Sequence, residues 1–300
     1  MNIITRAILP ALALTTVAAH AQLSAYLPSQ GQTVLSLGYQ FSSYDDFFVG
    51  KTSVPVVAAT GFKEQNQQTA SLTIEYGVTD RIALDATVGW TWARFRGGPI
   101  GDLKDEGLND TSFGVRYKLT NEEEGFLPTL TLRAGGIIAG TYDDGFPFSA
   151  GDGADAAEVS LIIGKQLCEW LGYYGDVGYR WRNNDVPDDL FFASGIWMRA
   201  GSFVVSAGYR HVEGQSGPDI GAPGFGTAFG FPQVKEVNQT LETSLTYQDN
   251  GGRNYSLSYG HTLDGKNTGE KDIFGVSVSI PFGGGSAPAP SGKTVRGYSK

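Results

Sequence analysis

The chain has 300 residues, with 22 lysines and arginines against 31 aspartates and glutamates, and a formal net charge of −9. Such an acidic chain offers no basic surface for phosphate groups, which excludes nucleic acid as a partner. The 42 glycines, the 12% of aromatic residues and the two methionines are typical of a sheet protein with many turns. The single cysteine, Cys168, excludes an intramolecular disulfide.

Residues 1–21 have the pattern of a secretory signal peptide. Arg6 supplies the positive charge, residues 7–19 form a short apolar stretch, and Ala19-His20-Ala21 is a cleavage site of the small-x-small kind. We therefore expect the mature protein to begin at Gln22. No other apolar segment reaches the roughly 20 residues that a transmembrane helix needs. The sequence predicts an exported protein without a helical anchor.

From Thr33 onward the chain alternates apolar and polar residues with a period of two, which only a β-strand can use. In the clearest segment Ile82, Leu84, Val88 and Trp90 share one face, and Asp85 lies on the other. We predict twelve strands: 33–43, 68–76, 82–95, 109–119, 129–141, 156–164, 171–182, 190–199, 203–212, 237–247, 255–263 and 273–282. Most have the length that a tilted membrane strand needs, about 9–11 residues.

The connections between these segments are alternately long and short. Long ones follow the odd-numbered segments, as at 44–67 and 213–236, and short ones follow the even-numbered segments, as at 77–81 and 200–202. A closed barrel with short periplasmic turns and long outer loops produces this alternation, and a soluble sandwich does not require it. We predict an all-β fold in which residues 22–282 form a single closed antiparallel transmembrane β-barrel of about 12 strands.

Aromatic residues of the apolar face lie near the ends of the segments. The expected outer girdle is Trp90, Trp92, Trp181, Tyr209 and Phe274, and the expected inner girdle is Tyr76, Tyr117, Phe203, Tyr247, Tyr255 and Phe282. Girdles at both interfaces are characteristic of barrels in an outer membrane. The predicted location is the outer membrane of a Gram-negative bacterium. The predicted partners are the lipid bilayer, lipopolysaccharide and the barrel-assembly machinery.

The polar face is predicted to line the lumen and carries the charged candidates. Four lie in the lower half and five in the upper half: Glu75, Asp85, Arg116 and Arg133, then Glu158, Asp176, Arg180, Arg182 and Arg210. Opposite charges on neighbouring strands of one sheet face lie within interaction range. They would form either a selectivity ring at a constriction or ion pairs that brace a narrow interior.

The outer loops carry two further candidate features. Acidic pairs such as Asp143-Asp144 and Asp188-Asp189 would either chelate divalent cations or remain solvated loop charges, and none has the spacing of an EF-hand loop. Loop 213–236 contains Phe225, Phe229 and Phe231, which would either fold into the mouth as a lid or pack on the rim. We predict no metal site and no cofactor.

Catalysis has little support in the sequence. The mature chain has two histidines, His211 and His261, and both lie on the apolar face beside tyrosines. A Ser/His hydrolase needs a hydroxyl within hydrogen-bond reach of the imidazole, and the nearby Ser256 and Ser258 lie on the opposite face. We predict that the protein is not an enzyme and that it has no catalytic residues.

Two stretches resemble a known family. The turn Tyr76-Gly77-Val78-Thr79-Asp80-Arg81 and the strand that begins Gly107-Leu108-Asn109-Asp110-Thr111-Ser112-Phe113 look like the repeated pattern of the outer-membrane transporter family of the meta-pathway of phenol degradation. The resemblance covers most of the mature chain. It implies passive uptake of small, often aromatic or hydrophobic compounds, and it carries over no site residues.

One departure from that family concerns the C-terminus, since such barrels usually end on the last aromatic residue, here Phe282. Residues 283–300 follow it, and their Gly/Ser/Pro-containing sequence predicts a flexible periplasmic tail. We predict a channel for passive uptake of small, possibly hydrophobic or aromatic, solutes. The competing expectation is a structural or surface-interaction barrel with acidic outer loops and a closed lumen.

Overall fold

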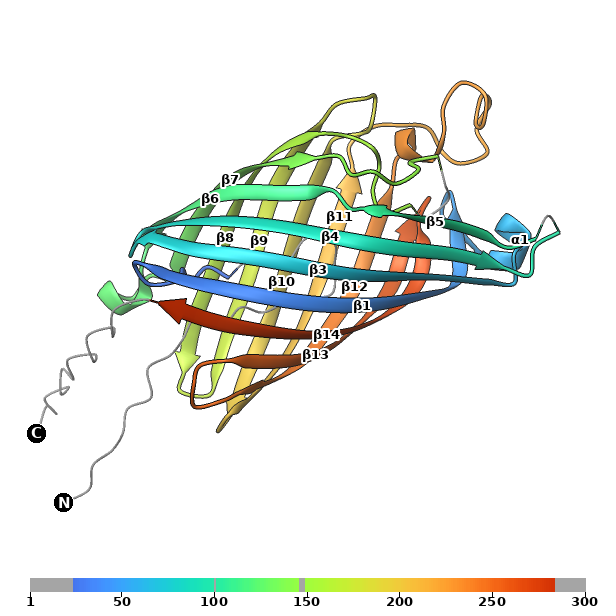
Figure 1. Cartoon of the computed structure of the whole chain (residues 1–300). Coiled ribbons are helices and arrows are strands. Elements are labelled where there is room, and N and C mark those ends of the chain that lie inside the picture. Colours follow the sequence, from blue (N-terminus) through green and yellow to red (C-terminus); the bar gives the residue numbers. More distant parts are fainter. Residues whose placement is uncertain (1–23, 100, 146–148, 284–300) are drawn as a thin grey trace, which may run out of the picture.

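The computed structural model describes residues 24–99, 101–145 and 149–283. The predicted signal peptide and nearly all of the predicted tail lie outside these residues. Fourteen antiparallel strands form one sheet, and twelve of them close into a barrel through pairing of the last strand with the first (Figure 1). The closed barrel of twelve strands confirms the predicted fold class. Among the described residues, no helix has the length and hydropathy to cross a membrane.

The barrel strands follow the chain order, each paired with the strand before it. They are β1 (Gln32–Val49), β3 (Glu64–Thr79), β4 (Ile82–Arg96), β6 (Thr111–Thr120), β7 (Thr129–Ile138), β8 (Ala156–Cys168), β9 (Leu171–Arg182), β10 (Asp189–Ala200), β11 (Phe203–Gly214), β12 (Val237–Gln248), β13 (Asn254–Lys266) and β14 (Gly269–Gly283). The small elements are β2 (Thr52–Pro55), α1 (Val56–Thr60), β5 (Leu103–Leu108) and the 3₁₀ turns η1 (Glu122–Glu124) and η2 (Phe231–Gln233).

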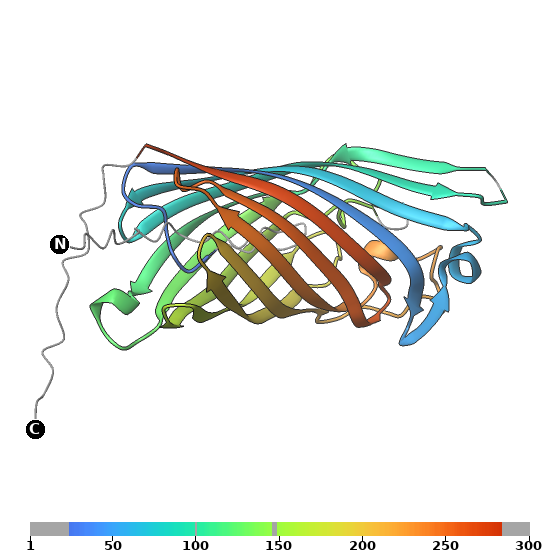
Figure 2. The same ribbon diagram turned by 90° about the horizontal axis from the view of Figure 1, so that it is seen from below.

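Several strands extend further outward than the alternation predicts. β1 continues to Val49, and β3 begins at Glu64. β2 and β5 pair with β1 and β4 in stretches expected to be loops, so the wall from β1 to β5 projects beyond the rest of the rim (Figure 2). β13 and β14 are separated only by Asn267 and Thr268, where a longer loop was expected. Where both faces of a strand are exposed to water, apolar and polar residues no longer need to alternate. Backbone pairing between the strands can therefore continue after the alternation has ended.

The inner and outer faces separate as the alternation predicts. On β4, Leu84 is 44% exposed and Trp90 is 40% exposed on the outer face, while Ala83, Asp85 and Thr91 are buried on the inner face. The predicted girdle residues Tyr76, Tyr117, Phe203, Tyr247, Tyr255, Phe282, Trp181 and Phe274 are likewise exposed on the outside. The apolar surface of the barrel therefore faces outward, and its polar residues fill the interior.

Candidate functional site

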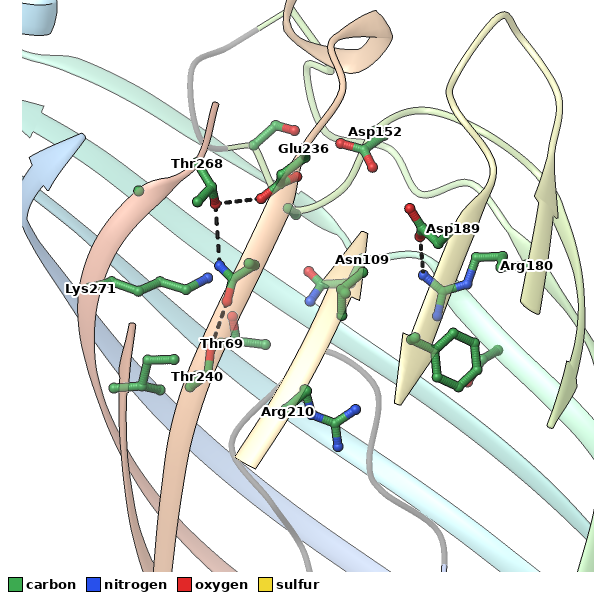
Figure 3. A pocket seen from close by; sticks show the side chains of 18 of the residues that line it. Thr69, Asn109, Asp152, Arg180, Asp189, Arg210, Glu236, Thr240, Thr268 and Lys271 are labelled. Atoms are coloured by element: carbon green, nitrogen blue, oxygen red, sulfur yellow. Dashed lines mark hydrogen bonds and ion pairs between the residues drawn. The ribbon is translucent and has the colours of Figure 1, made fainter. Parts of the chain in front are cut away.

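A cavity of 370 Å³ occupies the lumen between the ion pairs around Asp85 and the outer loops (Figure 3). Four aromatic rings line it, those of Tyr44, Phe47, Phe191 and Phe231. The charged lining residues are eight acids and five bases: Asp85, Asp144, Asp152, Glu158, Asp176, Asp189, Glu236 and Glu242, with Arg133, Arg180, Arg182, Arg210 and Lys271. The cavity therefore combines ring surfaces with an excess of negative charge.

A continuous chain of ion pairs runs along the inner wall from β3 to β10. At its lower end Arg116 pairs with Glu75, and its Nε lies 3.4 Å from Asp85 Oδ1. Arg133 then joins Asp85 to Glu158, with Nη2 2.8 Å from Asp85 Oδ2 and Nη1 2.6 Å from Glu158 Oε1. Each arginine contacts two carboxylates, so the charges are compensated inside the barrel.

The upper end of the same chain reaches an outer loop. Arg180 Nη2 lies 2.7 Å from Glu158 Oε2, and its Nη1 lies 3.2 Å from Asp189 Oδ2. Arg182 pairs with Asp189 and places Nη1 2.6 Å from Oδ2 of Asp152, which lies in the β7–β8 loop. The chain of ion pairs thus links the lower lumen to the mouth of the cavity.

In the lower half of this chain the register makes the ion pairs diagonal, whereas Arg180 lies directly opposite both Glu158 and Asp189. Glu75 faces Asp85 across β3 and β4, and Arg116 faces Arg133 across β6 and β7, so direct neighbours have like charge. Space for the diagonal contacts comes from Gly114, which lies opposite Asp85. A Cβ at Gly114 would lie 2.9 Å from Nε and Nη2 of Arg133. The missing side chain lets the guanidinium of Arg133 cross to Asp85.

Seven of the nine predicted lumen residues belong to this network, namely Glu75, Asp85, Arg116, Arg133, Glu158, Arg180 and Arg182. The other two, Arg210 and Asp176, line the cavity outside it. Arg210 Nε lies 3.1 Å from Glu242 Oε1.

Sequence reasoning missed Asp189 and Glu242. Glu242 shares the alternation of the inward Thr240 and Ser244, so the parity of β12 would have identified it. Asp189 was assigned to an acidic loop, whereas it is the first residue of β10 and points inward.

The three phenylalanines of loop 213–236 form one cluster at the mouth. The Phe225 ring lies 5.7 Å from that of Phe229 and 5.2 Å from that of Phe231, between ring centroids. Only Phe231 lines the cavity, together with Pro232 and Val234 of the same loop. Phe225 and Phe229 thus support the ring that reaches inward.

Asn267, in the β13–β14 turn, anchors this loop. It is 5% exposed and has a φ of 52°, in the left-handed region that Asn tolerates better than most residues. Its Oδ1 accepts hydrogen bonds from the backbone N–H groups of Gly50 (2.9 Å) and Ile220 (3.1 Å). Its Nδ2 donates to Lys235 O (2.8 Å) and to Asp219 Oδ1 (3.2 Å). One side chain therefore ties three outer segments together.

Glu236, in the outer loop directly before β12, has an altered acidity. It lines the cavity and accepts a hydrogen bond from the Thr268 hydroxyl (Figure 3). Burial, together with the nearby carboxylate of Asp152, raises the pKa of Glu236 to about 7, while the hydrogen bond from Thr268 and the charge of Lys271 oppose the shift. This carboxyl group therefore changes its charge near neutral pH.

Residues 24–31, which precede β1, cross the lower lumen, a placement that nothing in their sequence indicated. The carbonyl oxygen of Ser24 accepts a hydrogen bond from Arg116 Nη1 (3.2 Å), and that of Ala25 accepts one from the Thr131 hydroxyl (2.7 Å). The Tyr26 hydroxyl donates to Glu122 Oε1 (2.7 Å) on the periplasmic rim. This segment, together with the ion pairs around Arg116, lies beneath the cavity.

Away from the chain of ion pairs, hydroxyl groups pair across neighbouring strands of the inner wall. Ser36 and Ser279 are 2.7 Å apart between their Oγ atoms, as are Ser206 and Ser244. This part of the inner wall also holds the Arg210–Glu242 ion pair, on the same two strands as Ser206 and Ser244, so it combines hydroxyl pairs with a separate charged pair.

Both histidines lie on the outer face, as the alternation places them. The His211 ring stacks on Phe192 with centroids 5.1 Å apart, and His261 Nδ1 lies 3.0 Å from Asp272 Oδ1. In the loops, Asp155 accepts from the backbone N–H of Ala139, and Asp188 accepts from that of Arg182. Within the described ranges, no group of three His, Cys, Asp or Glu side chains is arranged to hold a metal ion.

The fold is similar to that of solved outer-membrane channels. The COG4313 outer membrane channel from Pseudomonas putida F1 superposes with a TM-score of 0.65 at 14% identity, over 86% of this chain and 98% of that one. A KdgM porin (TM-score 0.47, 11% identity, 83% and 99% covered) and the P. putida toluene transporter TodX (0.43, 11%, 86% and 91%) are more distant. At these identities the likeness shows the fold alone.

No family model matches the sequence, and no curated protein matches it. The resemblance to the transporter family of the meta-pathway of phenol degradation therefore stays a prediction.

Proposed function

We propose that this barrel lies in the outer membrane of a Gram-negative bacterium, where it acts as a non-enzymatic channel for passive uptake of small solutes. The observation that carries the proposal is the cavity of 370 Å³ inside the lumen, below a loop that contributes Phe231 to its wall. A barrel whose interior only braces its wall has no need of such a space, because side chains can fill a barrel of moderate size.

The lining supports a small aromatic compound with polar substituents as the solute. Tyr44, Phe47, Phe191 and Phe231 offer ring faces, while the charged groups around them offer hydrogen bonds. A purely apolar solute would leave those polar groups without partners. Phe231 then acts as the inner face of a lid, and Arg133 and Asp85 form the floor at which the passage narrows.

The ion pairs and residues 24–31 support a second candidate, a surface-interaction barrel with a closed lumen. Arg116 is fully buried, and the segment bound to it lies across the path below the cavity. Under the channel proposal this segment is displaced during passage. Under the second candidate it stays in place, and the acidic outer loops bind a partner.

Reconstitution of the purified protein distinguishes the two candidates. We expect steady single-channel ion steps in planar bilayers and faster equilibration of small phenolic solutes in proteoliposomes than in protein-free liposomes. A matched variant, Phe231→Ala, should alter solute permeation because it changes the cavity wall. Absence of both conductance and permeation in protein with heat-modifiable gel mobility, the mark of a folded barrel, would reject the channel.

A further inference from the structure

A pair of like charges projects from the outer face of the extended wall. Arg94 on β4 lies directly opposite Lys104 on β5. Among the residues that the structure describes, neither side chain has a carboxylate within ion-pair distance. Like charges directly opposite one another on a sheet face are destabilising. A fold that keeps such a pair without a counter-ion calls for an external anion.

The neighbouring side chains make a hollow around this pair. The residues that line it are Arg94, Phe95, Arg96, Asp102, Leu103 and Lys104. Of its charged members, Asp102 already accepts a hydrogen bond from the backbone N–H of Gly97, and Arg96 lies 4.0 Å from a carboxylate oxygen of Glu64.

Glu106 lies diagonal to Arg94 across β4 and β5, opposite Trp92, and Glu64 lies diagonal to Arg94 on the other side, opposite Arg96. The three bases Arg94, Arg96 and Lys104 are matched in number by three acids, Glu64, Asp102 and Glu106. The positive charge of Arg94 and Lys104 is nevertheless concentrated at one register position.

The position along β4 relates the pair to the membrane. Trp90, Trp92, Arg94 and Arg96 occupy successive outward positions, and Trp90 is strongly exposed. Tryptophans of the outer girdle lie at the interface. Each pair of residues adds about 7 Å along a strand, so Arg94 and Lys104 lie just beyond the girdle, at the depth of headgroup phosphates. Long basic side chains can reach such groups while their stems cover apolar surface.

We propose that Arg94 and Lys104, with Arg96, form a binding site for a phosphate group of lipid A in the outer leaflet. The proposal rests on the outer-membrane location given above, and it does not depend on whether the lumen conducts. Arginine offers a fork of N–H donors and lysine a point charge, a combination suited to a phosphate monoester. The site would fix the extended β3–β5 wall against the membrane surface.

Binding of bisphosphorylated lipid A to the purified full-length protein, in detergent and without divalent cations, tests the proposal. We expect Arg94→Gln/Lys104→Gln to weaken binding about tenfold or more, since two charge-assisted contacts are lost. The matched control is Arg81→Gln/Arg253→Gln, which removes two half-exposed bases at the opposite rim. It should bind like the wild type. Glu106→Gln should bind more tightly, because it removes a neighbouring acid.

Melting temperatures give a second measurement, in which the effect of the substitutions should depend on whether lipid A is present. Without lipid A, the Arg94→Gln/Lys104→Gln variant should melt no lower than the wild type, because a repulsive pair is gone. With lipid A, the wild type should gain more thermal stability than the variant. Unchanged binding by this variant would overturn the proposal. The proposal would also be overturned if both double variants lost the same binding affinity for lipid A. The same holds if the wild type bound dephosphorylated lipid A, or phosphatidylglycerol vesicles, as tightly as it binds bisphosphorylated lipid A. Channel conductance of the variant should equal that of the wild type, which separates this test from that of the proposed function.

Discussion

Arg116 shows how the interior of the barrel tolerates full charges. Its side chain is 0% exposed, and it contacts Glu75, Asp85 and the carbonyl oxygen of Ser24. Taking a charge out of water is costly, and only close partners of opposite charge compensate for the cost. Since Glu75 and Asp85 also face each other, removal of the arginine would leave two like charges side by side.

We expect Arg116→Gln to lower the free energy of unfolding by about 3–5 kcal/mol, because the buried Glu75 loses its ion-pair partner and Asp85 loses one of its two. Urea unfolding of the purified barrel, followed by gel mobility, measures the loss. Arg81→Gln is the control, because its ion pair with Glu124 is half-exposed and should contribute about 0–1 kcal/mol. Equal stabilities of the two variants would contradict the account of a coupled buried network.

Glu236 gives the mouth of the cavity a charge that depends on pH. Because its pKa in the folded protein is about 7, above the ordinary value of 4.5, the folded state holds a proton that the unfolded state has lost between these values. This group therefore contributes stability at low pH, and that contribution falls as the pH rises from 4.5 to 7. Above pH 7 the carboxylate adds to the excess of acids around the cavity.

Cation selectivity, read from reversal potentials, should therefore rise as the pH increases through about 7. Glu236→Gln should lose this step while retaining selectivity for cations from the remaining acids. The control is Asp249→Asn in a periplasmic turn, which removes one acid far from the mouth and should keep the step. A pH step that persists unchanged in Glu236→Gln would assign it to another group.

At the scale of elements, residues 24–31 lie across the lower lumen beneath the cavity. Their contacts use backbone carbonyls and small gaps in the wall. One such gap is Gly164 on β8, where a Cβ would lie 3.1 Å from the Tyr26 ring and 3.3 Å from Ala25 Cβ. A larger side chain at this position would have to push the segment aside.

We expect Gly164→Leu to displace residues 24–31 and to raise single-channel conductance, with the barrel still closed. Gly125→Leu is the matched control on the same rim, because a Cβ there meets nothing within 4 Å. Accessibility of a cysteine placed at Ser24 to a water-soluble thiol reagent gives an independent measurement. No gain in accessibility or conductance in Gly164→Leu would show that the segment does not limit passage.

The same elements show what sequence alone could predict. Alternation identified every barrel strand because one face meets apolar surroundings and the other meets the lumen. The alternation did not reveal the strand segments beyond the outer girdle, where β1 continues to Val49 and β5 forms. Both faces of these segments are exposed to water, so their residues need not alternate. The alternation also gave no signal for residues 24–31, whose burial depends on long-range contacts with Thr131 and Arg116.

The candidate site was predictable in its charges but not in its connections. Parity placed Arg133 and Asp85 inside, whereas their pairing depends on the diagonal geometry that Gly114 permits. Asp189 was missed because a strand end and a loop look alike in sequence.

On the scale of the whole molecule, the outward belt of apolar side chains is the surface that would meet lipid in the outer membrane proposed above. Val88 lies on the outer face of β4, midway between Leu84 and the girdle residue Trp92. An arginine at the midplane of a membrane barrel costs about 2–4 kcal/mol, and near the interface about 0–1 kcal/mol.

We therefore expect Val88→Arg to lose about 2–4 kcal/mol of folding free energy in lipid vesicles. Val78→Arg, at the periplasmic end of β3, should lose about 0–1 kcal/mol. Spin labels should agree: positions 84, 88 and 90 should respond to lipid-soluble relaxers, and positions 85 and 87 to water-soluble ones. The reverse pattern would mean that the register is shifted by one residue.

Closure of the barrel by β1 and β14 has a consequence for the order of assembly. This seam joins Gln32 to Gly283 and Phe47 to Gly269, the most distant strands in the chain, so its loop-closure entropy is the largest of any strand pair. Residues 24–31 directly precede β1, so this segment ends where the seam begins, at Gln32. If they lay outside when the seam formed, Arg116 and Thr131 would be sealed in without the carbonyl groups that satisfy them. We therefore expect capture of this short segment by β6 and β7 to precede or accompany the last pairing step.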